Sequence, residues 1–206
     1  MLFLAKFSIT PVCAVKVWKI WGPNAVQMIT ANPYILCEEE IGLSFEVPDL
    51  IAKTYDIDLE DENRIRAAIR YVLSQNLNNG HTCLPLKKLL SAAVPLLAVE
   101  ADVVQSCIER MAADESLIEV ERGQPYYYLP DLFVAENYIA SRIAEMVGEL
   151  VFEPENADQL IDAEERRLGM IYETLQRTAI RAALCENIMI LTGGPGTGKT
   201  TTLNGM

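Results

Sequence analysis

Residues 193–200 read GGPGTGKT, and this stretch most restricts what the end of the chain can fold into. Four glycines in eight residues make a continuous helix or strand unfavourable there, because glycine loses more backbone freedom on ordering than any other residue. The apolar run at 188–191 is typical of a buried parallel strand. A strand, a glycine-rich turn and a following helix are therefore predicted in that order.

The same stretch fits the pattern G-x-x-x-x-G-K-[ST] in full, and that pattern is typical of a loop that holds a nucleoside triphosphate. Glycines let the backbone N–H groups approach phosphate oxygens closely, and the next helix presents its positive end to them. Lys199 supplies a point charge for the outer phosphates, and the Thr200 hydroxyl holds Mg²⁺. ATP and Mg²⁺ are the expected cofactors, with Lys199 and Thr200 in the catalytic roles. The predicted nucleotide-binding residues of the loop are Gly193, Gly194, Pro195, Gly196, Thr197, Gly198, Lys199, Thr200 and Thr201.

The net charge of −12 is divided unevenly along the 206 residues. Residues 1–37 hold three lysines and no carboxylate, and residues 64–99 hold five basic residues and no acid. Residues 100–165 hold seventeen acids and three arginines. The whole-chain charge argues against nucleic acid as a partner, but two basic stretches remain. Each either contacts DNA or simply offsets an acidic neighbour.

Cysteine and histidine usage excludes several kinds of site. Five widely spaced cysteines without a Cys-x-x-Cys pair disfavour a disulfide framework and a zinc site, and favour free thiols in the cytoplasm. His81 is the only histidine, so no mechanism can use a histidine pair. No apolar run reaches the roughly 20 residues of a membrane span, so no membrane partner is expected.

Residues 9–60 read as short helices with tight connections. Pro11 opens a helix whose apolar positions are Val12, Val15, Trp18 and Trp21. A second short helix is expected over 24–30. Ser44 is expected to cap a third helix that runs through Lys53.

Residues 62–130 show a different pattern of predicted elements. Helices are expected over 65–77, 85–93 and 100–113, followed by strands at 117–121 and 126–129. Three helices and a β-hairpin form the plan of a winged helix. A long helix over 132–150, a polar linker over 152–159 and a helix over 163–185 follow. The stripe of that last helix comprises Leu168, Ile171, Tyr172, Leu175 and Ala179.

Three segments resemble the RecD-like superfamily 1 DNA helicases, kin of the exodeoxyribonuclease V alpha subunit. They are the loop with its flanks at 191–201, the pair NPY at 32–34 and EIGLSF at 40–45, and RIRAA at 64–68 leading to NGHT at 79–82. The resemblance covers nearly the whole chain. It implies an ATP-dependent helicase that moves 5′→3′ on single-stranded DNA or at single-strand/duplex junctions, in DNA repair or recombination. It also implies that Gln176 contacts the adenine base.

The expected fold is mainly α. Residues 1–60 form a helix-hairpin-helix-like region, 61–131 a winged-helix-like domain, 132–160 a long helix and linker, and 161–206 the start of a RecA-like α/β motor domain. The motor lacks its acidic strand and second half, so we expect a fragment that does not hydrolyse ATP alone.

Candidate DNA contacts lie in the two basic stretches, at Lys16, Lys19, Arg66, Lys87 and Lys88. The two expected hairpins, at 8–11 and 40–42, are poor in the glycines that the family's motif uses, and the second carries Glu40. We therefore expect structural hairpins rather than strong DNA grips. The third helix of the 61–131 domain carries Glu100, Asp102 and Glu109, which disfavours groove reading and favours protein partners for the acidic modules.

The tyrosines at 126–128 either stack on bases or are partly buried in the hairpin. The alternation of side chains along a strand favours burial of at least one of them. A different class of function also stays open. In that alternative the helical region is a non-catalytic module that binds protein or DNA structure, and its loop belongs to another P-loop ATPase.

Overall fold

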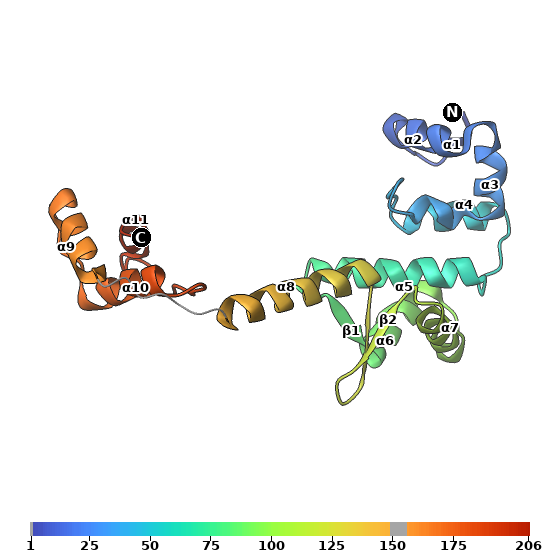
Figure 1. Ribbon diagram of the computed structural model, residues 1–206. Helices are drawn as coiled ribbons and strands as arrows, with labels where there is room; N and C mark the ends of the chain where they lie inside the picture. Colours follow the sequence, from blue (N-terminus) through green and yellow to red (C-terminus); the bar gives the residue numbers. More distant parts are fainter. Residues whose placement is uncertain (1, 149–155) are drawn as a thin grey trace. The chain divides into compact units, whose positions relative to one another are not determined.

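The computed structural model describes residues 2–148 and 156–206, which divide into two units at residues 134 and 135. The first unit is helical with one small sheet, and the second carries most of α8, the helices α9, α10 and α11, and the glycine-rich loop (Figure 1). The elements of the first unit, the last of which continues past residue 134, are α1 (Leu2–Ala5), α2 (Pro11–Trp21), the 3₁₀ helix η1 (Gly22–Asn24), α3 (Ala25–Ala31), the 3₁₀ helix η2 (Pro33–Cys37), α4 (Glu46–Thr54), α5 (Glu62–Leu77), β1 (Cys83–Pro85), α6 (Leu86–Leu97), α7 (Ala101–Ala113), β2 (Ile118–Glu121), β3 (Pro125–Tyr128) and α8 (Pro130–Gly148). The elements of the second unit are α9 (Ala157–Leu168), α10 (Thr174–Cys185) and α11 (Lys199–Asn204).

Helix α2 begins at Pro11, as predicted, but buries a different face. Thr10 caps it by accepting a hydrogen bond from the Cys13 N–H, at 3.3 Å. Ala14 and Val17 enter the small core formed by α1–α4, and Trp21 packs at its edge. The predicted stripe was therefore wrong: Val12, Val15 and Trp18 face outward. Small side chains let α2 lie close to α3, and periodicity alone could not choose between two apolar faces.

The predicted Ser44 cap was also wrong. Helix α4 begins at Glu46, with Phe45 at the N-cap position and no side-chain cap. Phe45 is buried, and its ring stacks on Tyr34 at a centroid distance of 5.8 Å. Burial of two aromatic rings fixes the start of α4 more strongly than a capping hydroxyl would, since a cap contributes only ~1 kcal/mol.

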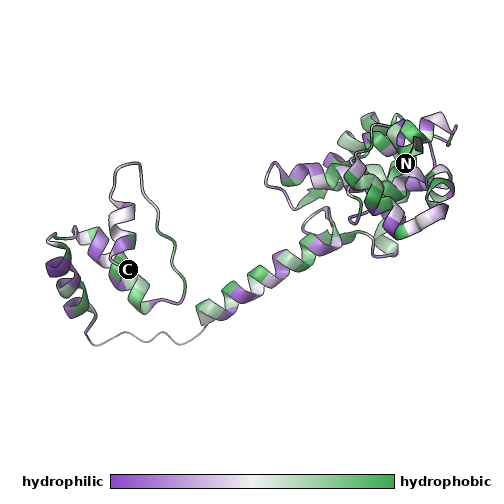
Figure 2. Cartoon of the chain, turned by 90° about the horizontal axis from the view of Figure 1, so that it is seen from above, coloured by the Kyte–Doolittle hydropathy of each residue, from purple (hydrophilic) through white to green (hydrophobic). Residues whose placement is uncertain are grey.

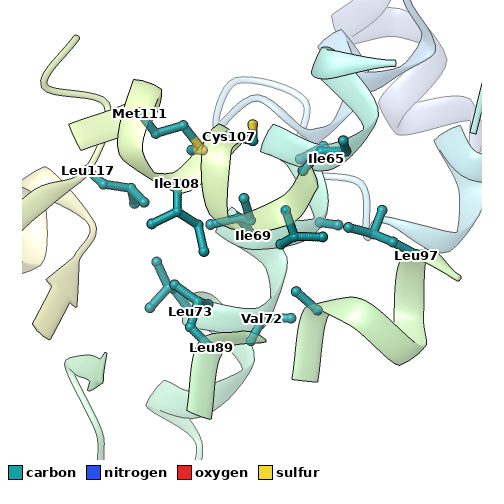
Figure 3. Packing of buried hydrophobic residues seen from close by; sticks show 14 of the residues in the cluster. Ile65, Ile69, Val72, Leu73, Leu89, Leu97, Cys107, Ile108, Met111 and Leu117 are labelled. Carbon is teal, nitrogen blue, oxygen red and sulfur yellow. The ribbon is translucent and has the colours of Figure 1, made fainter. Parts of the chain in front are cut away.

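Helix α5 is the spine of the larger core. Its residues Ile65, Ile69, Val72 and Leu73 meet α6 and α7 side chains in Figure 3. The predicted helices at 65–77 and 100–113 agree with α5 and α7. Helix α6 runs four residues beyond its predicted end at Ala93, through Pro95, and stops where Ala98 adopts a left-handed conformation.

The predicted hairpin is present, and a third strand joins it. The sheet order is β1-β3-β2, all antiparallel, with Leu84 opposite Tyr127 and Glu119 opposite Tyr127 on the other side. Strand β1 escaped prediction because it has three residues and ends in proline, which only an edge strand tolerates.

The β3 tyrosines are largely buried. Tyr127 enters the α5–α7 core, and Tyr128 packs on Phe133 of α8 with ring centroids 5.4 Å apart. Only Tyr126 keeps partial exposure among the three. Because Tyr127 and Tyr128 are buried on opposite faces of the strand, their rings are not accessible for stacking on bases.

One buried ion pair joins α4 to the α5–α7 core. Arg64 Nε donates to Asp49 Oδ1 at 2.7 Å, and Arg64 Nη1 donates to the carbonyl oxygens of Leu59 and Leu97. Tyr34 donates its hydroxyl to the same carboxylate oxygen at 2.9 Å. Burial raises the Asp49 pKa, but hydrogen bonds from Arg64, Lys53 and Tyr34 outweigh it and hold the pKa below its usual range. The cluster therefore stays ionised.

Helix α8 agrees with the predicted long helix through residue 148. Its apolar positions Ile139, Ile143 and Val147 are exposed, and Figure 2 shows hydrophobic and hydrophilic residues alternating along it. The expected end at 150 and residues 152–155 of the expected linker lie outside the described residues. The linker prediction was wrong for residues 157–159, which belong to helix α9.

The predicted helix at 163–185 was wrong: two helices, α9 and α10, occupy this part of the chain. Gly169 ends α9 with φ +65°, a left-handed conformation that L residues rarely adopt. A capping box between Glu173 and Gln176 then begins α10. The break turns the predicted stripe outward, so that Ile171 is 83% exposed and Leu175 81% exposed, while Tyr172 is buried.

The strand predicted at 188–191 was also wrong for this structure. Residues 188–191 carry no regular structure, and Ile188 and Ile190 are exposed. A strand needs backbone partners, and within residues 156–206 no other strand is present to supply them.

Within the described ranges, no single helix is long and apolar enough to cross a membrane. Helices α6 and α7 have sufficient length and apolar composition only when they are taken together, and the chain bends by 120° between them.

Replacing Arg64 by leucine is expected to lower the free energy of unfolding by about 3–5 kcal/mol, because the buried Asp49 carboxylate then loses its buried ion-pair partner. Chemical denaturation followed by circular dichroism measures this. The matched control is Lys53→Ala, which removes a mainly exposed partner of the same carboxylate and should cost below ~1 kcal/mol. Equal costs for the two variants would show that the buried pair does not anchor α4.

Replacing Gly205 by alanine is expected to loosen α11, because the added Cβ would overlap the buried Tyr172 hydroxyl and lie 2.9 Å from Ile180 Cδ1. Overpacking of this kind costs about 1–3 kcal/mol. Tyr172→Phe is the companion variant: it removes a buried hydroxyl that has no hydrogen-bond partner among the described residues, so stability should hold or rise. Amide exchange in α10 and α11 reports both effects, and unchanged exchange in Gly205→Ala would contradict the contact.

Candidate functional site

The glycine-rich loop turns through two glycines with positive φ. Gly196 has φ +75° and Gly198 has φ +76°, so both positions disfavour any residue with a Cβ. Gly198 directly precedes α11, and the chain turns there from the loop into the helix. The sequence folds this way because no side chain obstructs the turn.

Lys199 points back into the loop. Its ammonium donates hydrogen bonds to the carbonyl oxygens of Gly193 at 2.7 Å and Gly194 at 2.6 Å. The carbonyl contacts hold a positive charge at the centre of the loop. Thr197 Oγ1 also donates to the Gly194 carbonyl, at 2.9 Å.

Gly193 packs closely against Thr197. A Cβ at Gly193 would lie 2.7 Å from Thr197 Oγ1, closer than real Cβ contacts allow. A Cβ at Gly194 would meet Thr197 Cγ2 at an ordinary 3.8 Å, and one at Gly196 would meet open space. Pro195 is exposed in the middle of the loop.

Three threonines follow the lysine and differ in their surroundings. Thr200 is exposed and Thr201 is half-buried. Thr202, which sequence reasoning did not single out, is 3% exposed and donates its hydroxyl to the Gly198 carbonyl at 3.0 Å. Its position four residues after Gly198 is the signal that could have found it, since threonine bonds back by one helical turn.

Gln176 lies against the loop. Its Oε1 accepts a hydrogen bond from the Glu173 N–H at 3.0 Å, which caps α10. Its amide nitrogen occupies the space that a Cβ on Gly198 would fill. The structure therefore brings Gln176 of α10 together with the predicted loop residues that precede α11.

Ion pairs between α9 and α10 hold Gln176 in place. Arg177 contacts Asp162 at 2.6 Å and Glu165 at 2.8 Å, and Arg181 contacts Asp158 at 2.7 Å. Because Arg177 is the neighbour of Gln176, these contacts fix the first turn of α10. Arg177 and Arg181 thus hold α10 against α9.

The residues present fit a polyphosphate group. Glycines at 196 and 198 leave the backbone accessible, the loop is exposed, and the Lys199 ammonium faces its interior. Thr200 presents a hydroxyl one residue further on, in the first turn of α11. A loop with these features provides donors and positive charge to an anion and an oxygen ligand to a divalent cation.

The five candidate DNA-contact residues lie on three elements of the first unit. Lys16 and Lys19 are exposed on α2, and Lys87 and Lys88 are exposed on the first turn of α6. Arg66 of α5 differs from them, because its guanidinium contacts Glu62 and Asp114, each at 2.7 Å. Hydrogen bonds from Ser116, and then from Arg66, lower the pKa of Asp114 to about 2. Two carboxylates thus already neutralise Arg66, which weakens its case as a phosphate contact.

The hairpins show the expected shortage of glycine. Ser8 adopts φ +57° in the first, where glycine would be unstrained. Gly42 adopts φ +73° in the second, and its N–H donates to the Glu38 carbonyl at 2.7 Å. The carboxylates of Glu38, Glu39 and Glu40 are exposed beside it. The exposed side of α7 likewise carries Asp102 and Glu109.

Comparison with known proteins adds independent findings. Residues 1–83 match the family model described as the ATP-dependent RecD2 DNA helicase HHH domain, and residues 176–206 match the model of an AAA domain. The ATP-dependent RecD2 DNA helicase of Deinococcus radiodurans is 27% identical over 195 residues, a match that covers 89% of this chain and 27% of the relative. The chain therefore spans about a quarter of the length of that relative. The two models match opposite ends of the chain and the relative spans both, so the chain is similar to RecD-like helicases over most of its length.

Proposed function

We propose that this chain is the N-terminal part of an ATP-dependent DNA helicase that moves 5′→3′ on single-stranded DNA and unwinds duplexes in DNA repair or recombination. The observation that carries the proposal is the loop at 193–200, with Lys199 held at its centre and Gln176 against Gly198. The match of residues 1–83 to a DNA helicase HHH domain supports DNA, rather than another substrate, as the track.

In this proposal the loop holds ATP. The backbone N–H groups of Gly194 and of residues 196–199 would face the phosphates, Lys199 would neutralise their charge, and Thr200 would bind Mg²⁺. Bound Mg·ATP supplies the phosphoanhydride bond whose hydrolysis drives stepping. Gln176 contacts the adenine base, and its link to both Glu173 and Gly198 gives it a fixed starting position.

The first unit would then be an accessory region. Its α5–α7 helices and the β1–β3 sheet are proposed to be a winged-helix-like domain, preceded by a helix-hairpin-helix-like region. Acidic side chains on α7 and beside Gly42 favour a spacer or a protein contact over groove reading. Lys87 and Lys88 are the best presented candidates for DNA phosphates, because both are exposed.

Three further features belong to the same proposal. The protein works in the cytoplasm, it engages single-strand/duplex junctions, and its acidic helical surfaces contact other proteins. Free thiols support the first, since all five cysteines are unpaired in the structure.

Replacing Gly198 by alanine is expected to weaken binding of a fluorescent ATP analogue at least tenfold. A Cβ there is strained at φ +76° and displaces the Gln176 amide, and about 1.4 kcal/mol suffices for a factor of ten. Gly194→Ala is the matched control in the same loop. Its added Cβ makes only an ordinary contact, so binding should stay within about threefold. Equal affinities for the two variants would refute the role assigned to Gly198.

Replacing Lys199 by alanine in the full-length protein is expected to abolish ATPase activity that single-stranded DNA stimulates, with a loss of roughly 10²-fold or more. Lys53→Ala, at an exposed position of α4, should leave the rate unchanged. The measurement is the steady-state ATPase rate with and without an oligonucleotide. A wild-type rate that ignores DNA would sink the helicase proposal and favour another P-loop ATPase.

A further inference from the structure

The outer face of α2 is apolar and basic at once. Val12, Val15 and Trp18 are exposed there, Trp18 to 58%, while Ala14 and Val17 take the buried side. Lys16 and Lys19 lie between these apolar side chains at helical spacing. An exposed tryptophan beside two valines is a costly arrangement for a surface that meets only water.

A small apolar pocket opens beside Trp18. It has a volume of about 60 Å³, and its walls come from α1, α2 and α3. Phe3, Val17, Trp18, Val26 and Ile29 are among the lining residues, and no charged side chain lines it. Trp18 and Val26 are also exposed, so the pocket is continuous with the outer face of α2. This volume is several times the roughly 10–15 Å³ that one water molecule needs, so the tip of one aliphatic or aromatic side chain could enter.

The charged side chains of residues 1–37 all have the same sign. Lys6, Lys16 and Lys19 are exposed, residues 1–37 contain no carboxylate, and none of the three lysines forms an ion pair within the described residues. Unpaired lysines in an otherwise acidic protein attract negative groups. The occupant must therefore offer both carboxylates or phosphates and an apolar group.

Single-stranded DNA satisfies only half of this requirement. A base could stack on Trp18 and phosphates could meet the lysines. Val12 and Val15 gain nothing from phosphates, however, and the pocket is lined by apolar residues, whereas the edge of a base is polar. A peptide with acidic residues and an apolar side chain matches every part of the face.

We propose that the α2 face, formed by Val12, Val15, Lys16, Trp18, Lys19 and the adjoining pocket, docks an acidic peptide segment of a partner protein. One apolar side chain of the peptide enters the pocket against Trp18, and its carboxylates pair with Lys16 and Lys19. This inference does not depend on the proposed ATPase activity.

Fluorescence anisotropy on the whole chain tests the proposal with labelled synthetic peptides. Each peptide carries four acidic residues beside one variable side chain, which is leucine, isoleucine, methionine, phenylalanine or tryptophan. At least one acidic peptide should bind, and its amide counterpart, with asparagine and glutamine in place of the acids, should bind at least tenfold more weakly. Binding should weaken further as salt is raised.

Two variants locate the site. Trp18→Ala, an exposed position whose loss should spare the fold, should weaken binding about tenfold, as should Lys16→Glu combined with Lys19→Glu. The matched controls are Leu50→Ala, at an exposed position of α4, and Lys87→Glu combined with Lys88→Glu, which should bind as the parent chain does. The proposal fails if no acidic peptide binds, if both control variants lose binding equally, or if only a thymidine oligonucleotide binds and depends on Trp18.

Discussion

The contact between Arg64 and Asp49 is the constraint on which the first unit depends. A buried guanidinium costs several kcal/mol to desolvate, so it is tolerated only where its donors find partners. Arg64 meets a carboxylate and two backbone carbonyls, and these partners come from α4, from the segment before α5, and from the end of α6. One side chain thereby fixes where α4 meets the larger core. The hairpin that precedes α4 is positioned as a consequence, because Tyr34 bonds to the same carboxylate and Phe45 stacks on Tyr34.

In the second unit, hydrogen bonds and ion pairs hold the glycine-rich loop in place. This loop has little apolar surface to bury, so its geometry depends on hydrogen bonds and on glycine conformations. Gln176 links the loop to α10, and Arg177 and Arg181 link α10 to α9. These ion pairs are partly exposed and individually weak, yet they lie one helical turn apart on α10. Helix α9 and the loop thus both contact α10.

How far the sequence predicted this structure depends on the kind of signal. Local chemistry was sufficient for the glycine-rich loop, for Pro11 at the start of α2 and for the hairpin of β2 and β3. Local chemistry could not predict which side chains are buried, because α2 has two apolar faces and only the packing of Ala14 and Val17 against α3 selects one of them. The break at Gly169 was missed because a single glycine inside an apolar period can be tolerated or can end a helix. Strand β1 and the Arg64 cluster depend on residues far apart in sequence, which no local pattern records.

The outer surface of α2 follows from this packing. When small side chains fill the inner face, the larger apolar residues Val12, Val15 and Trp18 are turned to solvent, where they lower solubility unless a partner covers them. The hairpins nearby keep one positive-φ glycine between them, and acidic side chains surround it, so phosphate binding there is poorly supported. A region that shares a fold with a DNA-binding module can therefore keep its scaffold while its exposed surface changes ligand. In the proposed docking, the three lysines of residues 1–37, a segment without carboxylates, favour a negatively charged partner, and the apolar pocket favours a peptide over a nucleic acid backbone.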